Sequence, residues 1–166
     1  LVSERESVKA IDRILEVLLN LGKTEKDPNV LAEAVRQSMS QSICNDLRES
    51  HPDLAVMSIH PTLETKLKAG MTLINGQETV LLEPNLAAKV TKAFVEASAE
   101  MQAQGRNPVL LCGSEIRRIM HLFLQRSTPK LSVLSLNEIP KSIELTSFKI
   151  IEVDTREVER RDVDAL

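Results

Sequence analysis

Apolar residues recur with helical spacing near the start of the chain. Over residues 7–21 they fall every three or four positions, which places them along one face of an α-helix. They are Val8, Ile11, Ile14, Leu15, Leu18 and Leu21. We predict that Ser7 caps this helix and that Gly22 ends it.

A second helix is predicted to follow and to end near residue 48. Asp27 is placed to cap it and Pro28 to stand at its first position, where proline is favoured. Its apolar face comprises Leu31, Ala34, Val35, Met39, Ile43 and Leu47. Because each helix has one strongly apolar face, the helical hairpin requires further protein to cover it.

The pattern changes after residue 52. Short apolar runs predict strands within 51–61, 76–84, 108–112, 131–140 and 143–153, and helical spacing predicts helices over 61–70, 83–105 and 114–126. Strands that alternate with helices indicate an α/β domain, here with a mixed sheet. The long helix 83–105 is expected to turn inward Leu86, Val90, Phe94, Ala97 and Met101.

These elements predict a fold of the α+β or α/β class in three parts. Residues 1–52 form a helical subdomain, and residues 53–153 form a small α/β subdomain. Residues 154–166 form a charged tail, with eight charged residues among thirteen.

The composition of the chain argues against several classes of function. The chain of 166 residues has a net charge of −3, three Phe, and no Tyr or Trp, so it has neither the basic surface nor the aromatic platforms of nucleic-acid binders. Its two cysteines show no disulfide or metal-ligand spacing. No apolar run approaches the length of a membrane span. The chain opens without Met and already in a helical pattern, and we interpret it as a piece of a longer protein.

One motif suggests chemistry. Cys112 and Arg118 have the Cys-x5-Arg spacing of cysteine-dependent phosphatases, between a predicted strand and helix. A helix N-terminus lowers a thiol pKa and attracts phosphate. Against this hypothesis, Gly113 is the single glycine available to shape a phosphate loop, and Ser114 is predicted to cap the helix at once, which carries Arg118 away from the loop. In the competing interpretation Cys112 is a small core residue.

Other catalytic and metal-binding patterns are absent from the sequence. His51, His60 and His121 share no metal-ligand spacing, and we interpret them as capping or surface residues. The chain has no nucleophile elbow, Walker loop or dinucleotide fingerprint. We therefore predict no catalytic residues, no cofactor and no metal.

The helix at 114–126 has one polar face. Ile116, Ile119, Met120 and Phe123 are predicted to face the core. The opposite face carries Arg117, Arg118, His121 and Gln125. We expect Arg117, Arg118 and His121 to be exposed, either as a solvated surface or as a site for an acidic partner.

An ordered set of short motifs resembles a known family. The motifs are Ser3-Glu4-Arg5, Ile14-Leu15-Glu16, Asp27-Pro28, Val35-Arg36, Pro108 to Leu111, Ile116-Arg117, and the run LSVLSLNEIP. Their order and spacing up to about residue 153 resemble the late cytoplasmic part of the export-gate proteins of type III secretion, the FHIPEP family. The motifs fit the flagellar and the virulence-injectisome branches alike.

The resemblance implies a parent protein in the bacterial inner membrane, anchored by an N-terminal half, with this chain on the cytoplasmic side. It implies a homo-oligomeric ring, usually of nine subunits, without enzymatic activity. Its partners would be export substrates, chaperone–substrate complexes and components of the export ATPase. The main chaperone-docking site of the family would lie upstream of residue 1.

In such a ring, neighbouring protein would cover the apolar faces of the helical hairpin. Polar residues on its helices are then candidates for contacts between subunits. They are Arg5, Asp12, Arg13, Glu16 and Arg36.

Overall fold

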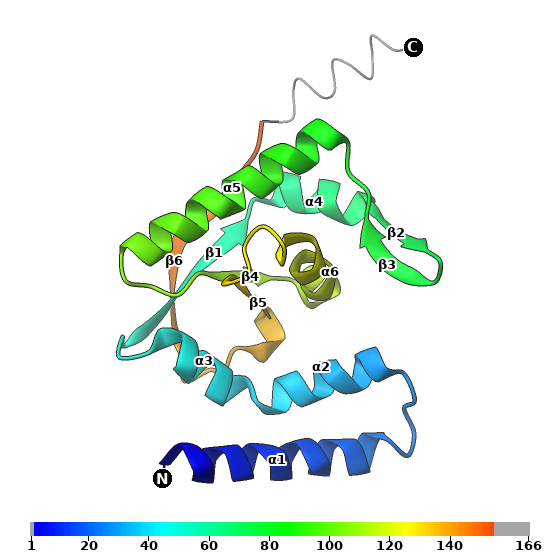
Figure 1. Cartoon of the computed structure of the whole chain (residues 1–166), viewed down its shortest axis with the longest axis vertical. Coiled ribbons are helices and arrows are strands. Elements are labelled where there is room, and N and C mark those ends of the chain that lie inside the picture. The colour runs from blue at the N-terminus through cyan, green and yellow to red at the C-terminus, as the bar shows by residue number, and fades with distance from the viewer. Residues whose placement is uncertain (1, 155–166) are drawn as a thin grey trace.

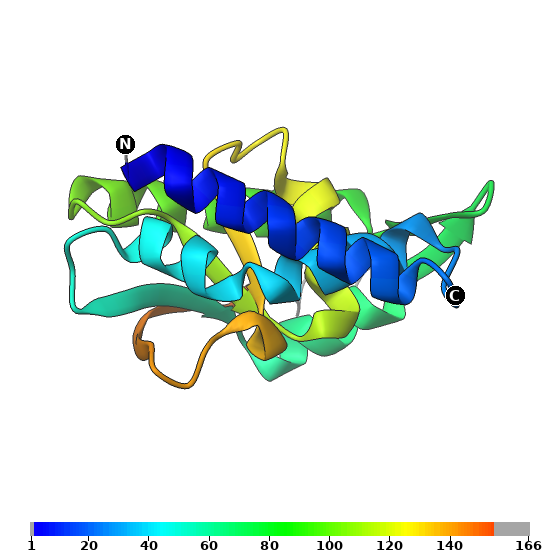
Figure 2. The same ribbon diagram turned by 90° about the horizontal axis from the view of Figure 1, so that it is seen from below.

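The structure is a computed structural model that describes residues 2–154, with side chains from residue 11 onward. Two helices lie at one side of the molecule: α1 (Val2–Leu21) and α2 (Pro28–Ser38) pack against each other, with α1 outermost (Figures 1 and 2). The prediction that Ser7 caps α1 is wrong, because the helix begins before it. Gly22 follows the last residue of α1, where a Cβ atom would clash with the carbonyl oxygen of Leu18.

The predicted second helix is broken into two. Asp27 caps α2 as expected, and its side chain accepts a hydrogen bond of 2.9 Å from the Asn29 N–H. The helix ends at Met39, where the backbone leaves helical geometry at φ −98° and ψ 6°, and α3 (Ser40–Arg48) follows. The Ser38 hydroxyl donates to the Val35 carbonyl oxygen at 2.7 Å, a local bond that competes with the helical ladder.

A four-stranded parallel sheet forms the centre of the α/β part. The strand order is β5 (Ser132–Ser135), β4 (Val109–Cys112), β1 (Asp53–Ile59) and β6 (Glu144–Ile151). A separate antiparallel hairpin consists of β2 (Met71–Ile74) and β3 (Gln77–Val80). Asn75 and Gly76 form its turn with φ of 53° and 76°, the backbone that a tight hairpin requires. The predicted α/β class is confirmed, with parallel and antiparallel pairing divided between two sheets.

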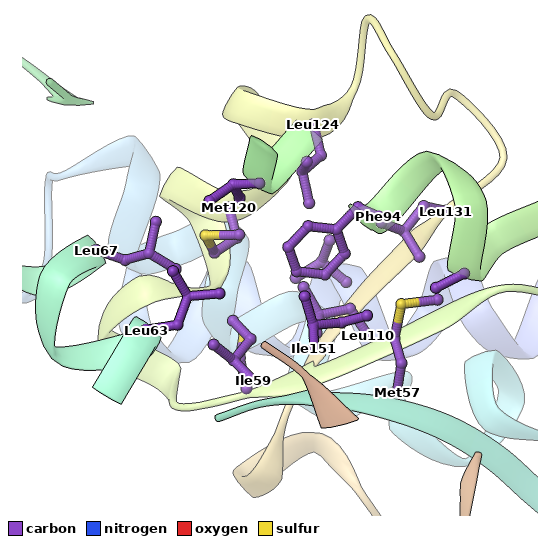
Figure 3. Close-up of a cluster of buried hydrophobic side chains, with 14 of the residues drawn as sticks. Met57, Ile59, Leu63, Leu67, Phe94, Leu110, Met120, Leu124, Leu131 and Ile151 are labelled. Atoms are coloured by element: carbon purple, nitrogen blue, oxygen red, sulfur yellow. The ribbon is translucent and has the colours of Figure 1, made fainter. Parts of the chain in front are cut away.

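One face of the sheet is covered by α4 (Pro61–Ala69), α5 (Pro84–Ala103) and α6 (Ser114–Leu124). Successive strand residues point to opposite faces, so Met57 and Leu110 enter this core while Val56 and Val109 enter the other. Figure 3 shows Phe94 of α5 at the centre of the larger core, among side chains of the sheet, α4 and α6. All five residues predicted to face inward from this helix are buried: Leu86, Val90, Phe94, Ala97 and Met101.

The other face is covered by α3 and by the connection from β5 to β6. Cys44 of α3 packs there with Leu54, Val56 and Leu134. The connection includes a short 3₁₀ helix, η1 (Leu136–Glu138), and adds Ile143 to the same core. None of the helices among the described residues is long and apolar enough to cross a membrane. Most of the predicted charged tail, residues 155–166, lies outside the described residues.

Candidate functional site

The guanidinium of Arg117 is buried where α6 faces α2. It donates hydrogen bonds to both carboxylate oxygens of Glu33, one of them 3.2 Å from Nε, and a further one of 3.4 Å to the carbonyl oxygen of Val133. The residue is 6% exposed. The prediction that Arg117 points outward is therefore wrong. Helical periodicity placed it opposite the apolar face, but α2 covers part of that opposite face.

Glu138 also lies close to this guanidinium. Its carboxylate accepts hydrogen bonds of 3.2 and 3.3 Å from Arg36 of α2, and Nε of Arg117 lies 3.7 Å away. The Glu138 side chain is 1% exposed. Arg36 also donates to the carbonyl oxygen of Val133 at 3.4 Å. Arg36, expected to face a neighbouring subunit, thus has its guanidinium engaged within its own chain.

We call Glu33, Arg36, Arg117 and Glu138 the four-charge cluster. Two positive and two negative side chains alternate in it, so the cluster is neutral. Charges taken out of water are tolerated only when they are paired and hydrogen-bonded in this way. The cluster joins α2 to α6 and η1, elements that lie up to 102 residues apart in the sequence.

Sequence reasoning did not find Glu33 and Glu138. A signal for Glu138 exists, because it is a lone acidic residue in the mostly apolar run from Leu131 to Ile139. Its partners could not be found from spacing, since Arg36 and Arg117 come from two distant helices. Glu33 looks like any solvated helical carboxylate.

The outward side of α1 carries both charged and apolar residues. Asp12, Arg13 and Glu16 are exposed there. Large apolar side chains lie exposed beside them: Leu19 at 67%, Ile11 at 55% and Leu15 at 51%. Arg5 belongs to α1, but its side chain lies outside the described side chains. The other described residues of the chain therefore leave these apolar side chains uncovered.

A groove of about 820 Å³ separates α2 from the β2–β3 hairpin and the start of α6. Its lining is mixed: Val30 and Leu73 are apolar, while Asp27, Glu78 and Arg118 are charged. Arg118, the residue after the buried Arg117, is half-buried and lines this groove. The three basic residues predicted to share one face are therefore separated. Arg117 belongs to the cluster, Arg118 lines the groove and His121 lies at the surface.

His121 is exposed on α6, as predicted. The protein surface beside its ring removes part of its hydration, and the positive charges of Arg117 and Arg36 lie nearby. Both effects lower the pKa of His121 below its ordinary value of 6.5. His121 is therefore more strongly neutral at physiological pH than a solvated histidine.

Cys112 does not have the environment of a nucleophile. Its thiol lies in the larger core, with Sγ 3.8 Å from the carbonyl oxygen of Leu134. Burial raises the pKa of Cys112 to about 12, although the positive charge of Arg117 acts in the opposite direction. The thiol is thus protonated at neutral pH, which argues against the phosphatase hypothesis. The predicted Ser114 cap is also wrong, since Gly113 precedes α6 and no side chain caps it.

The histidines have local structural roles. His60 caps α4, because its Nδ1 accepts a hydrogen bond of 3.2 Å from the Thr62 N–H. Nδ1 of His51 lies 3.1 Å from the carbonyl oxygen of Arg48. Among the described residues, no group of three or more His, Cys, Asp or Glu side chains is arranged to hold a metal ion.

Comparison with known proteins identifies the family. The FHIPEP family matches residues 1–144. The chain belongs to the FHIPEP family. The resemblance found in the sequence motifs is thereby confirmed. The flagellar biosynthesis protein FlhA of Borreliella burgdorferi is 27% identical over 154 residues, which are 93% of this chain and 22% of FlhA. This FHIPEP chain spans about a fifth of the length of the curated relatives that it matches.

Solved structures of other proteins share the fold. The CdsV protein of Chlamydia pneumoniae, in its complex with CdsO, has a TM-score of 0.75 and 25% identity, and the match covers 87% of this chain and 42% of the CdsV chain in that structure. The nonameric EscV cytosolic domain of the type III secretion system has a TM-score of 0.63 and 22% identity, with 86% of this chain and 42% of that domain's chain covered. The FHIPEP chain described here thus has the fold of such cytosolic domains.

Proposed function

We propose that this FHIPEP chain is part of a type III protein export gate and helps to build its ring. The observation that carries the proposal is the exposed apolar surface of α1, defined by Ile11, Leu15 and Leu19. Exposed apolar residues of this size, bordered by charged ones, are typical of surfaces that another protein covers. A neighbouring subunit of a homo-oligomeric ring, nonameric like the EscV cytosolic domain, supplies such a cover.

In this proposal Asp12, Arg13 and Glu16 surround the apolar contact and set its orientation. Charged residues at the rim of an interface contribute more to specificity and association rate than to affinity. Arg5 belongs to the same proposed contact by its position on α1. Arg36 has a weaker case, because its guanidinium is bound to Glu138.

The export partners follow from the same proposal. The ring receives export substrates, chaperone–substrate complexes and components of the export ATPase on the cytoplasmic side of the bacterial inner membrane. The reported complex of CdsV with CdsO supports a docking role for proteins of this fold. Arg118 and His121 stay candidates for a partner surface, whereas Arg117 is withdrawn from it because it is buried. The chain has no enzymatic role in this account, and the membrane is contacted only through the rest of the parent protein.

The proposal is tested by Arg13→Glu in the full-length protein, with Lys92→Glu as the matched control. Both residues are exposed helical cations, and Lys92 lies on α5, in the α/β part rather than on the proposed interface. We expect Arg13→Glu to reduce ring assembly and protein export while Lys92→Glu leaves both unchanged. Equal assembly and export in the two variants would show that this face of α1 is not the ring contact.

A further inference from the structure

The helix α2 is attached to the α/β part in an unusual way. No residue of α2 is fully buried, although its apolar residues Leu31, Ala34 and Val35 are half-buried. Two ion pairs join it to the α/β part, from Glu33 to Arg117 and from Arg36 to Glu138. The attachment therefore depends on a few directional contacts rather than on a tightly packed apolar face.

The neighbouring helix α3 is attached quite differently. Cys44 is completely buried against the sheet, and Ile43 and Leu47 pack around it. The side chain of Asn107 donates a hydrogen bond of 2.8 Å to the carbonyl oxygen of Leu47. The break at Met39 thus separates a helix that is fixed on the sheet from one that is held by charges.

The groove runs along α2 beside the cluster, and Glu33 of the cluster is one of its lining residues. Asn29, Val30 and Gln37 of α2 line it on one side, and Leu73 and Gln77 of the hairpin line it on the other. A groove of about 820 Å³ leaves room for α2 to move without a clash on this side.

If α2 separates from the α/β part, each of them keeps one positive and one negative residue of the cluster. Glu33 and Arg36 are three residues apart on α2, a spacing at which opposite charges can pair on one helix. Arg117 and Glu138 both belong to the α/β part and lie 3.7 Å apart. If α2 moves away, the Arg117–Glu138 pair stays on the α/β part, and the Glu33–Arg36 pair moves with α2 into water. Separation therefore avoids the large cost of an uncompensated buried charge.

We propose that the four-charge cluster is a reversible latch that holds the α1–α2 hairpin on the α/β part, with Met39 as the pivot. Release of the latch lets α2 swing about Met39 and changes the width of the groove. Asn29 lies ten residues from the pivot, or about 15 Å along a helix, so a swing of roughly 20° moves it by about 5 Å. The latch is a property of this chain and does not depend on ring assembly.

The test uses the double variant Glu33→Gln/Arg36→Gln, which removes the two charges of α2 and leaves the Arg117–Glu138 pair intact. The matched control is Lys92→Gln/Glu96→Gln, which neutralises an exposed ion pair at i,i+4 on α5. Spin labels on cysteines introduced at Asn29 and Gln77 report the distance across the groove, because both positions are exposed and line it. The native thiols of Cys44 and Cys112 are buried and do not compete for the label.

We expect the distance distribution between the labels to broaden and its mean to change by about 5 Å in the double variant. The control variant should give the distribution of the wild-type chain. Circular dichroism should show the same helix content in both variants. The same narrow distribution in the double variant and the wild-type chain would overturn the proposal. Loss of helix content in the double variant would also overturn it, because the cluster would then be required for folding rather than for position.

Discussion

Arg36 and Glu138 lie 102 residues apart in the sequence and are joined by two hydrogen bonds of 3.2 and 3.3 Å. The guanidinium and the carboxylate meet side by side, which is the strongest geometry available to this pair of residues. Arg117 contacts the same carboxylate from α6. The buried charge of Glu138 thus depends on both the helical hairpin and the α/β part.

Glu138→Gln should lower the free energy of unfolding by about 2 to 3 kcal/mol, because it removes the buried carboxylate that Arg36 and Arg117 share, although Arg117 keeps its bonds to Glu33. The matched control is Glu100→Gln, which breaks the exposed ion pair with Lys149 and should cost less than about 1 kcal/mol. Urea unfolding followed by circular dichroism measures both. Equal stability of the two variants would show that the cluster contributes no more than a surface ion pair.

The two thiols should resist alkylation in the folded protein. Burial raises the pKa of Cys112 to about 12, and burial together with the charge of Glu138 raises the pKa of Cys44. Iodoacetamide at pH 8 should therefore modify neither cysteine under native conditions and both of them in urea. Mass spectrometry of digested protein measures the extent at each site. Rapid native modification of Cys112 would revive the hypothesis of a reactive thiolate.

His121 should make stability depend on pH. The pKa of His121 is lower in the folded state than in the unfolded chain. Below about pH 6.5 the unfolded chain therefore binds a proton more readily than the folded one, and stability decreases as the pH is lowered. The variant His121→Gln lacks this contribution. We expect the wild-type chain to lose more stability than His121→Gln between pH 7.5 and pH 5, measured by urea unfolding. A larger loss in the variant would mean that the folded-state pKa is raised.

The core around Phe94 should be the most sensitive to truncation. Phe94 is completely buried among α4, α5, α6 and the sheet, so Phe94→Ala should cost about 3 to 5 kcal/mol. Val95, its neighbour on the same helix, is 40% exposed, and Val95→Ala should cost less than about 1 kcal/mol. Thermal or urea unfolding of the two variants separates these expectations. Similar losses would mean that Phe94 is poorly packed.

The elements that could be predicted from sequence are those whose apolar spacing alone decides their burial. The inward face of α5 is of this kind, because one strong stripe of residues such as Val90 and Phe94 meets one core. The four-charge cluster could not be predicted. Arg117 pairs with Glu33, 84 residues earlier, and no periodicity within α6 contains that information. A helical wheel distinguishes an apolar face from a polar one, but not a solvated polar face from one that another helix covers.

The break at Met39 was missed for a related reason. The apolar spacing of Val35, Met39 and Ile43 continues through it, so the pattern alone favours one helix. The chain instead breaks, and α3 packs on the sheet through Cys44, which the predicted apolar stripe did not include. Tertiary packing decided the helix boundary here. The capping signal of Asp27 and Pro28 was correct because it acts within a single turn.

The most direct test of the central claim compares two equally exposed leucines. Leu19 on α1 and Leu73 on the β2–β3 hairpin are both 67% exposed, and each is changed to Gln in the full-length protein. Mass photometry of the purified protein counts the subunits in each assembly. If a neighbouring subunit covers α1, Leu19→Gln shifts the protein from rings to smaller species, and Leu73→Gln forms rings like the wild type. Intact rings of Leu19→Gln, with the subunit number of the wild type, would contradict the account.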